Sequence, residues 1–566
     1  MASLFTPYVS PSPTNCAFCN ISSTCVCSSC KKVAYCSKQH QQKHWKDHKP
    51  LCFPIVLKNN KILGRHLITT RDIKQGEIIL KEQPLISGPH FGEETPDFIN
   101  GPICLGCFRQ VETNYACSKC GWPVCGVECE INKQHLELEC KIFTQANRKF
   151  ASLMENLQNF NIYEAITVLR CALQKRVNPK NWEKIKSLQS NHGKLKESEI
   201  GIKLISGCIS FIRDFCQLTD LSDEDISHIL GVIAINAFFS DDGVPVDGPR
   251  VYRNGTYLYH IASMCAHNCT PNTAWSIKSN SEMHLMATVS IKIGESVTIL
   301  YCDGTLPTRE RRMQLKEDKD FDCSCDRCSS PSEMYSYFTG VKCCEKSCAD
   351  NFYLLPVDRA GETWKCENCN KEKSREFIES IYSKIDADLN SLNLEDDFTH
   401  SAVERLSNVI SKYAGVMLHQ NHFKIYNMAT ELIQRISFLL SQQQSRNSKI
   451  KKRENKLVGL LLDYGAMLIH VTDIILPGLN RQRGRILYYM QKGLIIRLFD
   501  GIKHTKGGDT SQSDQWRAKL DQVLKIRREV GKIFAGEMEG FEEFYIGMEM
   551  TIEHPEILRL QKILGN

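Results

Sequence analysis

The chain lacks the two sequence features that direct a protein into a membrane or out of the cell. Its N-terminus, Met-Ala-Ser-Leu-Phe-Thr-Pro, has no basic stretch followed by an apolar run, so we expect no signal peptide. The longest apolar stretch, 457–476, is interrupted by Asp463, His470 and Asp473, which predicts a core helix rather than a membrane span. We therefore expect a reducing setting in the nucleus and cytoplasm, no membrane partner, and metal sites rather than disulfides at paired cysteines.

An excess of one charge sign is also lacking. Over 566 residues the formal net charge is only +6, which excludes neither nucleic acid nor protein partners. The exception is the segment 31–61, which contains eight lysines and one acidic residue, Asp47. This basic patch is either a solvated lysine face or a surface for acidic partners. Neither this patch nor the basic group Arg481, Arg483 and Arg485 is accompanied by a base-reading motif. We therefore expect at most non-specific, salt-sensitive contact with nucleic acid.

Cysteine, by contrast, is abundant, and most of the 28 cysteines lie in clusters with the spacing of metal ligands. The segments 16–52 and 104–140 each supply eight cysteine or histidine ligands, enough for two tetrahedral zinc sites. Segments this short cannot bury a core of their own. Zinc binding must therefore provide most of their folding free energy.

The order of the ligands in each segment favours two interleaved zinc sites. We predict four sets: Cys16, Cys19, Cys36 and His40; Cys27, Cys30, His48 and Cys52; Cys104, Cys107, Cys125 and Cys129; Cys117, Cys120, His135 and Cys140. Closed four-coordinate sites of this kind are structural, whereas catalytic zinc needs an open position. A further group, Cys343 or Cys344 with Cys348, Cys366 and Cys369, indicates a zinc knuckle, with free thiols in a loop as the alternative.

Hydrophobic periodicity divides the rest of the chain into a mixed part and a helical part. Short apolar stretches bounded by turn residues predict strands at 55–58, 62–70, 77–86 and between 251 and 301. The segment 145–240 is expected to be helical, with spacing that includes Leu153 and Leu157, and with a helix that begins at Ser222 and continues to Phe239. After Lys373 the spacing predicts helices in pairs, typical of a helical-repeat domain.

Five separated motifs follow one another in an order that is informative only when they are taken together. They are Gly64-Arg65-His66-Leu67, Asn236-Ala237-Phe238, His267-Asn268-Cys269-Thr270-Pro271-Asn272, Gly294-Glu295 with Tyr301, and Cys323-x-Cys325-x2-Cys328. In this order, and interrupted by the cysteine segment 104–140, they resemble the SET and MYND domain family of methyltransferases over residues 55–372. The segment 16–52 resembles the MYND zinc finger through Tyr35-Cys36-Ser37 and Trp45-x2-His48-Lys49. The extra finger, with Cys120-Gly-Trp-Pro, resembles an arthropod-specific, SmydA-like branch of the family.

The resemblance implies an α+β fold. It consists of a β-rich SET fold with a pseudo-knot, inserted zinc-finger modules, and an all-α TPR-like C-terminal domain, and in it the loop 267–272 threads beneath the Tyr301 segment. The implied domains are an N-terminal MYND-type finger (16–52), an N-terminal SET segment (55–103), a second MYND-like finger (104–140), a helical insert of the SET domain (141–235), the SET core (236–303), a post-SET zinc segment with the knuckle (304–372), and the helical TPR-like domain (373–566).

The resemblance also implies an S-adenosylmethionine-dependent protein-lysine N-methyltransferase that acts on a histone or a non-histone protein. Tyr301 matches the catalytic tyrosine, and the implied cofactor-binding residues are Arg65, Asn236, Ser263, His267, Tyr301 and Phe321. Cys269 would join Cys323, Cys325 and Cys328 in a zinc site that pins the post-SET segment over the cofactor cleft. With Cys343 taken as the first ligand of the knuckle, the chain would hold about five to six structural zinc ions.

Three departures from the family pattern concern this cofactor site. His66 replaces the second glycine of Gly-Arg-Gly-Leu, which matters if the backbone needs a positive φ there, and Ser296 replaces the second glutamate of Gly-Glu-Glu. Ala266 replaces the asparagine before His267, and the loss of its hydrogen bond would cost about 1–3 kcal/mol of cofactor binding. The alternative function is a catalytically impaired SET-scaffold adaptor or transcriptional corepressor, whose MYND fingers bind proline-rich peptides or corepressors. In either case we expect a monomer.

Overall fold

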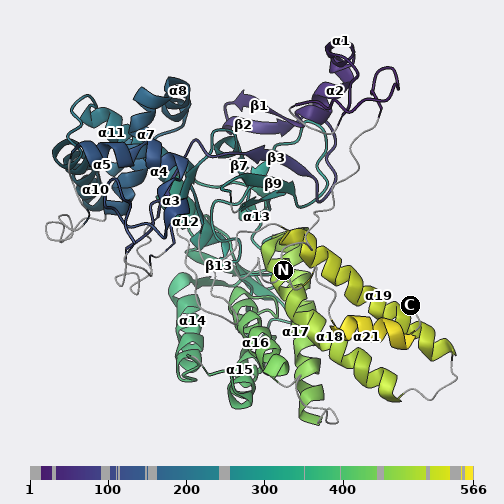
Figure 1. Ribbon diagram of the computed structural model, residues 1–566. Coiled ribbons are helices and arrows are strands. Elements are labelled where there is room, and N and C mark those ends of the chain that lie inside the picture. Colours follow the sequence, from purple (N-terminus) through teal and green to yellow (C-terminus); the bar gives the residue numbers. More distant parts are fainter. Residues whose placement is uncertain are drawn as a thin grey trace.

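The structure is a computed structural model that describes residues 15–28, 33–90, 102–109, 111, 115–146, 150, 162–240, 255–278, 280–349, 351–395, 397–442, 452–504, 510–535, 550 and 555–564. Figure 1 shows a mixed part, with short strands at its centre and helices beside them, above a separate array of long helices. The predicted α+β fold class is confirmed, because strands and helices both occur up to about Ser374 and only helices follow among the residues described after it.

The mixed part is built on several small sheets rather than one large one. β1 pairs with β2, β3-β9-β8 and β4-β6-β5 form three-stranded antiparallel sheets, and β7 pairs with β10 in parallel. The strand bounds are β1 Ile55–Asn60, β2 Gly64–Thr69, β3 Ile78–Glu82, β4 Ile86–Pro89, β5 Phe238–Ser240, β6 Gly255–Leu258, β7 Ala266–His267, β8 Thr273–Ile277, β9 Met283–Ala287 and β10 Thr298–Ile299.

The loop that follows β7 is bonded closely to the segment that leads to Tyr301. Ala266 pairs with Thr298 and His267 with Ile299 across the parallel β7·β10 pair. The Asn272 side chain accepts from the Thr298 backbone N–H (2.8 Å) and donates to the Ser296 carbonyl (2.8 Å). These bonds use both the donor and the acceptor of one amide, so they fix the position of the Asn272 loop against residues 296–298.

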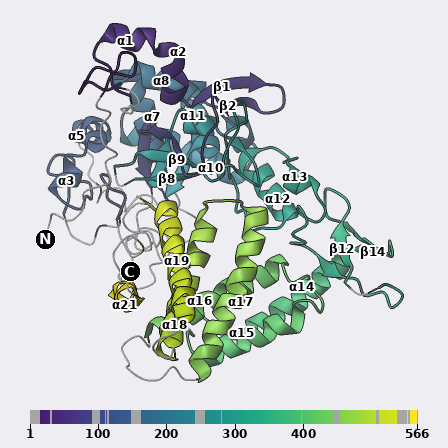
Figure 2. The same cartoon turned by 90° about the vertical axis from the view of Figure 1, so that its right-hand side faces the viewer.

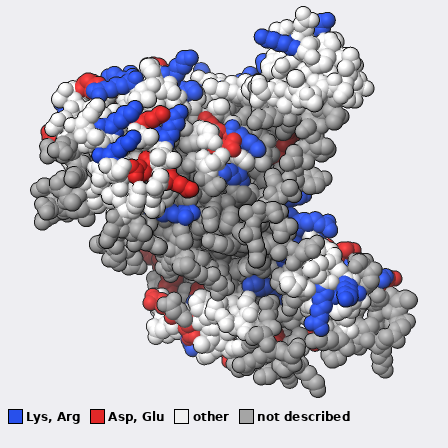
Figure 3. Space-filling view, viewed as in Figure 1, with Lys and Arg blue, Asp and Glu red and all other residues white. Residues whose placement is uncertain are grey.

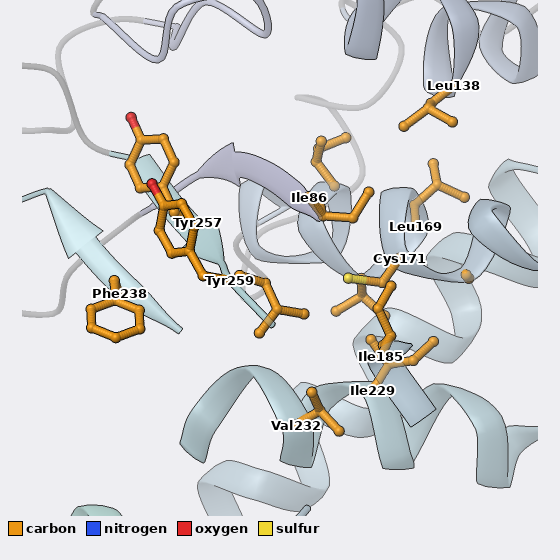
Figure 4. Close-up of a cluster of buried hydrophobic side chains, with 14 of the residues drawn as sticks. Ile86, Leu138, Leu169, Cys171, Ile185, Ile229, Val232, Phe238, Tyr257 and Tyr259 are labelled. Carbon is orange, nitrogen blue, oxygen red and sulfur yellow. The ribbon is translucent and has the colours of Figure 1, made fainter. Parts of the chain in front are cut away.

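A helical insert covers the β4-β6-β5 sheet and holds the second finger. Ile86 from the sheet packs near Leu169, Ile185 and Ile229 of the helices (Figure 4). The finger is part of the same core, since Trp122 is fully buried and stacks on Phe143 at 4.2 Å between ring centroids. The helices are α3 Val127–Glu130, α4 Lys133–Glu137, α5 Glu139–Gln145, α7 Ile162–Val177, α8 Pro179–Ser187, α9 His192–Leu195, α10 Glu199–Ser210 with a π-helical turn Phe211–Phe215, and α11 Asp223–Asn236.

The first finger is less integrated than the second. Its helices, α1 (Lys38–Lys43) and α2 (Trp45–Cys52), project from the body on the side of the strands away from α3 and α4 (Figure 1). It has a small core of its own around Cys16, Cys27 and Tyr35. The two fingers therefore lie at separate places on the molecule, and only the second one shares the core of the SET region.

The C-terminal part is an array of antiparallel helices joined to the mixed part by a small sheet. Figure 2 shows α15 to α19 side by side below the strands. α17 is long and apolar enough to cross a membrane by length and composition alone, but Leu461, Leu468 and Val471 are buried between α16 and α18. The elements are α12 Thr308–Lys319, α13 Asp326–Ser329, β11 Val341–Lys342, β12 Tyr353–Pro356, β13 Thr363–Cys366, β14 Glu372–Ser374, α14 Arg375–Asn390, α15 His400–Tyr413, α16 Phe423–Gln442, α17 Lys452–Ile475, α18 Arg481–His504, α19 Thr510–Ile533 and α21 Pro555–Leu564.

Three of the expected elements have different bounds. The strand expected at 77–86 is two strands, β3 and β4, because Pro84 has no N–H for a ladder and interrupts the extended run. The helix expected to reach Phe239 begins after Ser222 as predicted but ends at Asn236, and Phe238 belongs to β5. The turn between the strands expected at 55–58 and 62–70 lies at 61–63, because β1 continues to Asn60. Leu153 and Leu157 lie outside the described residues.

A buried charge cluster joins the mixed part to the helical array. The carboxylate of Glu333 accepts from Arg311 (2.8 Å) and from Arg327 (2.8 Å), and all three side chains are fully buried. Arg327 also donates to the Gly304 carbonyl (2.8 Å) and the Ile475 carbonyl at the end of α17 (3.4 Å). Glu333 thus neutralises the buried charges of Arg311 and Arg327, and Arg327 in turn bonds the mixed part to the end of α17.

Replacing Glu333 by glutamine is expected to lower the free energy of unfolding by about 3 kcal/mol, because two buried guanidinium groups lose their counter-charge. Desolvation alone would raise the pKa of Glu333, but Arg311 and Arg327 outweigh it and hold the pKa below its usual range. The stabilisation is therefore present above the unfolded-state pKa of about 4.3 and is lost as the pH falls through the folded-state value. Urea unfolding at pH 7 and at pH 3 measures both effects. An E333Q protein as stable as the wild type at pH 7 would contradict them.

Candidate active site and zinc clusters

A cavity of about 970 Å³ opens where the SET strands, α11, α12 and α18 meet. It is of the size that holds a small-molecule ligand with room for a second group. Three of the predicted site residues line it, Asn236, Ser263 and Tyr301, together with the aromatic side chains of Phe238 and Trp275. Arg65, His267 and Phe321 are not among the lining residues. Aromatic walls with a few polar groups suit a cofactor that has a planar base and a polar tail, so the residues present fit S-adenosylmethionine.

Tyr301 follows β10, and its ring forms part of the cavity wall. Its hydroxyl donates to the Cys265 carbonyl, which leaves the oxygen lone pairs as acceptors toward a neighbouring N–H. Burial raises the pKa of Tyr301, so the phenol stays protonated at neutral pH. This geometry suits an orienting acceptor better than a general base.

His267 lies behind Tyr301 and connects it to a cysteine cluster. Its Nδ1 accepts from the Tyr301 backbone N–H (3.1 Å), and its Nε2 lies 3.2 Å from the Cys269 sulfur. Burial lowers the pKa of His267 to about 4, so the ring is neutral and carries its proton on Nε2, facing the sulfur. The Phe321 ring packs against His267 (5.8 Å) and edge-on to Tyr301 (6.4 Å). The structure thus brings these three rings together.

The other two cavity residues are fixed by bonds to backbone atoms. The Asn236 amide donates to the Gln189 carbonyl (2.7 Å) and the Val232 carbonyl (2.8 Å), and the Ser263 hydroxyl donates to the Asn236 carbonyl (3.1 Å). The turn that carries Ser263 is held by Glu82 of β3, whose carboxylate accepts from the backbone N–H groups of His260, Ile261 and Ala262. Glu82 belongs to no recognisable sequence motif, so its support of this turn could not be predicted from the sequence.

The remaining predicted residues lie farther from the cavity. Arg65, in β2, is exposed. His66 is buried, and the positive φ of this turn is at Gly64 (61°), so the histidine costs no backbone strain. Ala266 is half-buried in β7, next to His267, with its N–H bonded to the Val297 carbonyl (3.3 Å). Ser296 bridges to Ile68 through the backbone.

The structure gathers most of the predicted zinc ligands into compact groups whose ligand atoms lie within 4.8 Å of one another. Tetrahedral Zn–S bonds of about 2.3 Å separate the sulfurs by about 3.8 Å. The observed sulfur distances are 3.9 Å for Cys269–Cys323, 3.6 Å for Cys107–Cys125 and 3.8 Å for Cys117–Cys140. The groups are Cys16, Cys19, Cys36 and His40; Cys104, Cys107, Cys125 and Cys129; Cys117, Cys120, His135 and Cys140; Cys269, Cys323, Cys325 and Cys328; Cys343, Cys348, Cys366 and Cys369.

Two of the predicted ligand groups, the knuckle and the second set of the first finger, have different outcomes. In the knuckle the structure places Cys343 in the cluster, 3.7 Å from Cys369, while Cys344 is exposed. In the first finger Cys27 lies 3.9 Å from Cys52, and His48 is fully buried nearby, but Cys30 lies outside the described residues. The second set of that finger therefore stays a prediction.

The second finger has an outer layer of support that its ligand spacing did not reveal. His135 places Nε2 3.8 Å from the Cys120 sulfur, and its Nδ1 bonds Glu139 at 2.8 Å. Arg170 of α7 donates to Glu139 (2.8 Å), to the Ser87 carbonyl (2.7 Å) and to the Leu105 carbonyl (2.8 Å). A carboxylate that fixes the orientation of a histidine ligand is a recurrent feature of zinc sites. Through Arg170 it also ties the finger to the SET sheet.

Several cavity residues were not assigned to the site from the sequence. Lys319 and Trp275 belong to no motif, and Arg481 and Arg485 were considered only as part of a basic surface. The structure turns these arginines toward the cavity, with Arg481 5.5 Å from the Trp275 ring, while Arg483 pairs with Asp473 and Glu529. Figure 3 shows Lys and Arg interspersed with Asp and Glu, and in that view the described residues form no continuous basic face.

Comparisons with known proteins agree with this geometry. Residues 64–302 match the SET domain family and residues 16–52 match the MYND finger family. The chain is 26% identical over 347 residues to the SET domain-containing protein SmydA-8, isoform B, of Drosophila melanogaster, which covers 60% of this chain and 72% of that protein. It is 22% identical over 495 residues to the histone-lysine N-methyltransferase ASHR1 of Arabidopsis thaliana, a match that covers 81% of this chain and 93% of ASHR1. It is 24% identical over 318 residues to the human histone-lysine N-methyltransferase SMYD3, a match that covers 54% of this chain and 68% of SMYD3.

In this chain the matched MYND finger precedes the matched SET region, and that region supplies most of the residues that line the cavity. The chain therefore has a SET domain and a MYND finger, and its similarity to SmydA-8 and SMYD3 supports the SET and MYND domain-containing family with a SmydA-like branch.

Proposed function

We propose that the protein is an S-adenosylmethionine-dependent protein-lysine N-methyltransferase whose substrate is a histone or another protein of the nucleus or cytoplasm, and that it acts as a monomer. The observation that carries the proposal is the cavity beside Tyr301, with Asn236 and Ser263 in its wall and the Cys269 cluster behind it. The relatives named as histone-lysine N-methyltransferases support the same reaction class.

The bound cofactor would supply an electrophilic methyl group on a sulfonium sulfur. Asn236, Ser263 and the ring of Tyr301 would hold it, and the apolar walls would exclude water from the reacting atoms. A lysine has a pKa of about 10.4 in water and must lose a proton before it can accept a methyl group, which a dry cavity favours. Because the Tyr301 hydroxyl donates to Cys265, its oxygen can accept an N–H of the amine and direct the nitrogen lone pair.

The acceptor would reach this place between the SET strands and the helical array. Arg481 and Arg485 of α18 line the same cavity as Tyr301, so the C-terminal part contributes one of its walls. This supports an entry path formed by both parts of the molecule. The full chain, rather than the SET region alone, is therefore the form to test.

The experiment is a calorimetric titration of the full chain with S-adenosylmethionine, followed by incubation with labelled cofactor and a panel of histones and cell lysate. Saturable binding at one site per chain and label on a protein lysine would support the proposal. A chain that retains its zinc yet binds no cofactor would remove the enzyme function.

Restoring the family's asparagine in an Ala266→Asn variant is expected to strengthen S-adenosylmethionine binding by roughly tenfold, because it supplies one hydrogen bond beside His267. Ala266→Leu, which adds similar volume without a polar group, is the matched control and should not gain affinity. Calorimetry measures both. Equal affinities of A266N and the wild type would mean that the natural site is complete without this side chain.

A second function is favoured by the surface of the first finger. Phe18, Trp45 and Phe53 are large aromatic side chains with 46%, 37% and 47% of their surface exposed, and Trp45 and Phe53 lie 6.1 Å apart. Extended proline-rich peptides dock on exposed aromatic side chains of this kind. We therefore propose that the finger binds proline-rich peptides of partner proteins such as corepressors. This binding would accompany methyl transfer or, in a protein that does not bind the cofactor, would make the protein an adaptor instead of an enzyme.

A further inference from the structure

Lys319 places a positive charge inside the cavity, beside the proposed catalytic residue. It is the last residue of α12, and its Nζ lies 5.8 Å from the centroid of the Tyr301 ring. The same Nζ donates to the carbonyls of Ala234 (3.2 Å) and Ile235 (2.8 Å), in the last turn of α11. The side chain is half-buried and belongs to the cavity wall.

The direction of the side chain is set by the end of α12. Asp320, the next residue, adopts a left-handed conformation (φ 56°), which ends the helix and turns the chain back toward Phe321. Lys319 is thereby aimed at α11 rather than at solvent. The carbonyls at a helix C-terminus have no partner within the helix and carry partial negative charge, so they attract an ammonium group.

Capping a helix end does not by itself require a position in the cavity. Lys194 of α9 makes the same kind of contact with α12, donating to the carbonyls of Lys316 (2.9 Å) and Glu317 (3.1 Å). Lys194 is not among the residues that line the cavity. The two lysines therefore share a structural role, and only Lys319 adds charge to the site.

The acidic groups nearby do not cancel this charge. Glu317 and Asp318 belong to the cavity lining but are exposed, so water screens them. Asp303 also lines the cavity and is exposed to water, and its carboxylate faces Thr305, whose backbone N–H and hydroxyl each donate to it at 2.8 Å. Desolvation lowers the pKa of Lys319, in agreement with an ammonium group that has lost part of its hydration.

We propose that Lys319 is a specificity-determining residue of the cofactor site, which disfavours a second cation beside Tyr301 and so weakens binding of the sulfonium form of the cofactor relative to its neutral thioether form. The inference rests on the proposed function. The same field disfavours a protonated lysine and favours the neutral amine, which is the form that can accept a methyl group. Lys319 would thus act on both the donor and the acceptor through charge alone.

The test compares two ligands that differ by one methyl group and one charge. S-adenosylmethionine carries the sulfonium charge and S-adenosylhomocysteine does not, so the ratio of their affinities reports the field at the sulfur. Both dissociation constants are measured by calorimetry on the wild type and on Lys319→Met, Lys319→Arg and Lys194→Met variants. Because both constants come from one preparation, the ratio does not depend on the fraction of folded protein.

Removing the charge in K319M is expected to shift the ratio toward S-adenosylmethionine by about tenfold. K319R, which keeps the charge, and K194M, which loses an equivalent helix cap outside the cavity, should keep the wild-type ratio. If K319M does not fold, Lys319→Gln provides the same neutralisation with a polar group that can still donate to the helix end.

Each outcome decides the inference. A shift of the affinity ratio in K319M that is absent from K319R and K194M supports it. Binding of S-adenosylmethionine by K319M, where none of the other proteins binds it, supports it as well. A ratio unchanged in K319M, or shifted equally in K194M, overturns the role of Lys319 and leaves the proposed function intact. Failure of both ligands to bind any of these proteins overturns the proposed function and the inference together.

Discussion

A Tyr301→Phe variant is expected to transfer methyl groups to a protein lysine about 100 to 1,000 times more slowly than the wild type. The hydroxyl donates to the Cys265 carbonyl, and this bond fixes its oxygen as an acceptor facing the cavity. Phenylalanine keeps the ring and its contacts with His267 and Phe321 but provides no acceptor for the amine. We therefore expect the change in the rate of methyl transfer, measured with labelled cofactor, and little change in cofactor affinity measured by calorimetry.

Tyr259→Phe is the matched control for this substitution. Tyr259 is also a buried tyrosine that donates its hydroxyl to a backbone carbonyl, that of Ser281 at 2.7 Å, and it does not line the cavity. Both variants lose one hydrogen bond of the same kind and should lose similar stability, about 1 kcal/mol. Equal transfer rates for Y301F and the wild type, or an equal loss in Y301F and Y259F, would exclude Tyr301 from the chemistry.

The parts of the site that the sequence predicts well are those whose chemistry is local. Zinc ligands such as Cys104 and Cys107 are close in the chain, and tetrahedral coordination restricts which pairs can share an ion. Cys269 is the exception, because it lies far from Cys323 in the sequence and was implied by the family resemblance alone. The structure brings the two sulfurs to 3.9 Å.

The parts that the sequence does not predict depend on how separate elements pack. Nothing in the residues around Lys319 or Glu82 marks them, since a lysine at a helix end or a glutamate in a strand is usually solvated. Their roles arise because α12 ends against α11 and because β3 lies beside the turn that carries Ser263. Element bounds fail for a similar reason. Helix propensity would allow α11 to continue to Phe239, but Phe238 gains more by pairing with Tyr257 of β6.

Replacing Cys269 by serine is expected to remove about one zinc ion per chain and to release the post-SET segment from the SET core. Cys269 is the only ligand of its group that comes from the SET strands, and the other three follow α12. A structural zinc site contributes on the order of 10 kcal/mol to the folding of the segment that it closes, and three remaining ligands hold the ion less tightly. Zinc content by elemental analysis and limited proteolysis after α12 measure the two effects.

The neighbouring thiol of Cys302 provides the control. Cys302 is buried and packs in the same small cluster as Cys269 and Cys323, but it is not among the four grouped ligands. Cys302→Ser should therefore keep its zinc and its resistance to protease. Loss of zinc from both variants, or from neither, would contradict the assignment of Cys269 as the fourth ligand.

The same variant connects the zinc cluster to the cofactor site. His267 contacts the Cys269 sulfur through Nε2 and the Tyr301 backbone through Nδ1, and Phe321 packs on both rings. Without the ion, Cys323 no longer anchors Phe321, and His267 loses the charged sulfur that orients its ring. We therefore expect C269S to bind S-adenosylmethionine at least tenfold more weakly than the wild type, although Cys269 does not line the cavity. Equal affinities would mean that the ring cluster is held by the SET strands alone, and that the zinc site stabilises the fold without shaping the cavity.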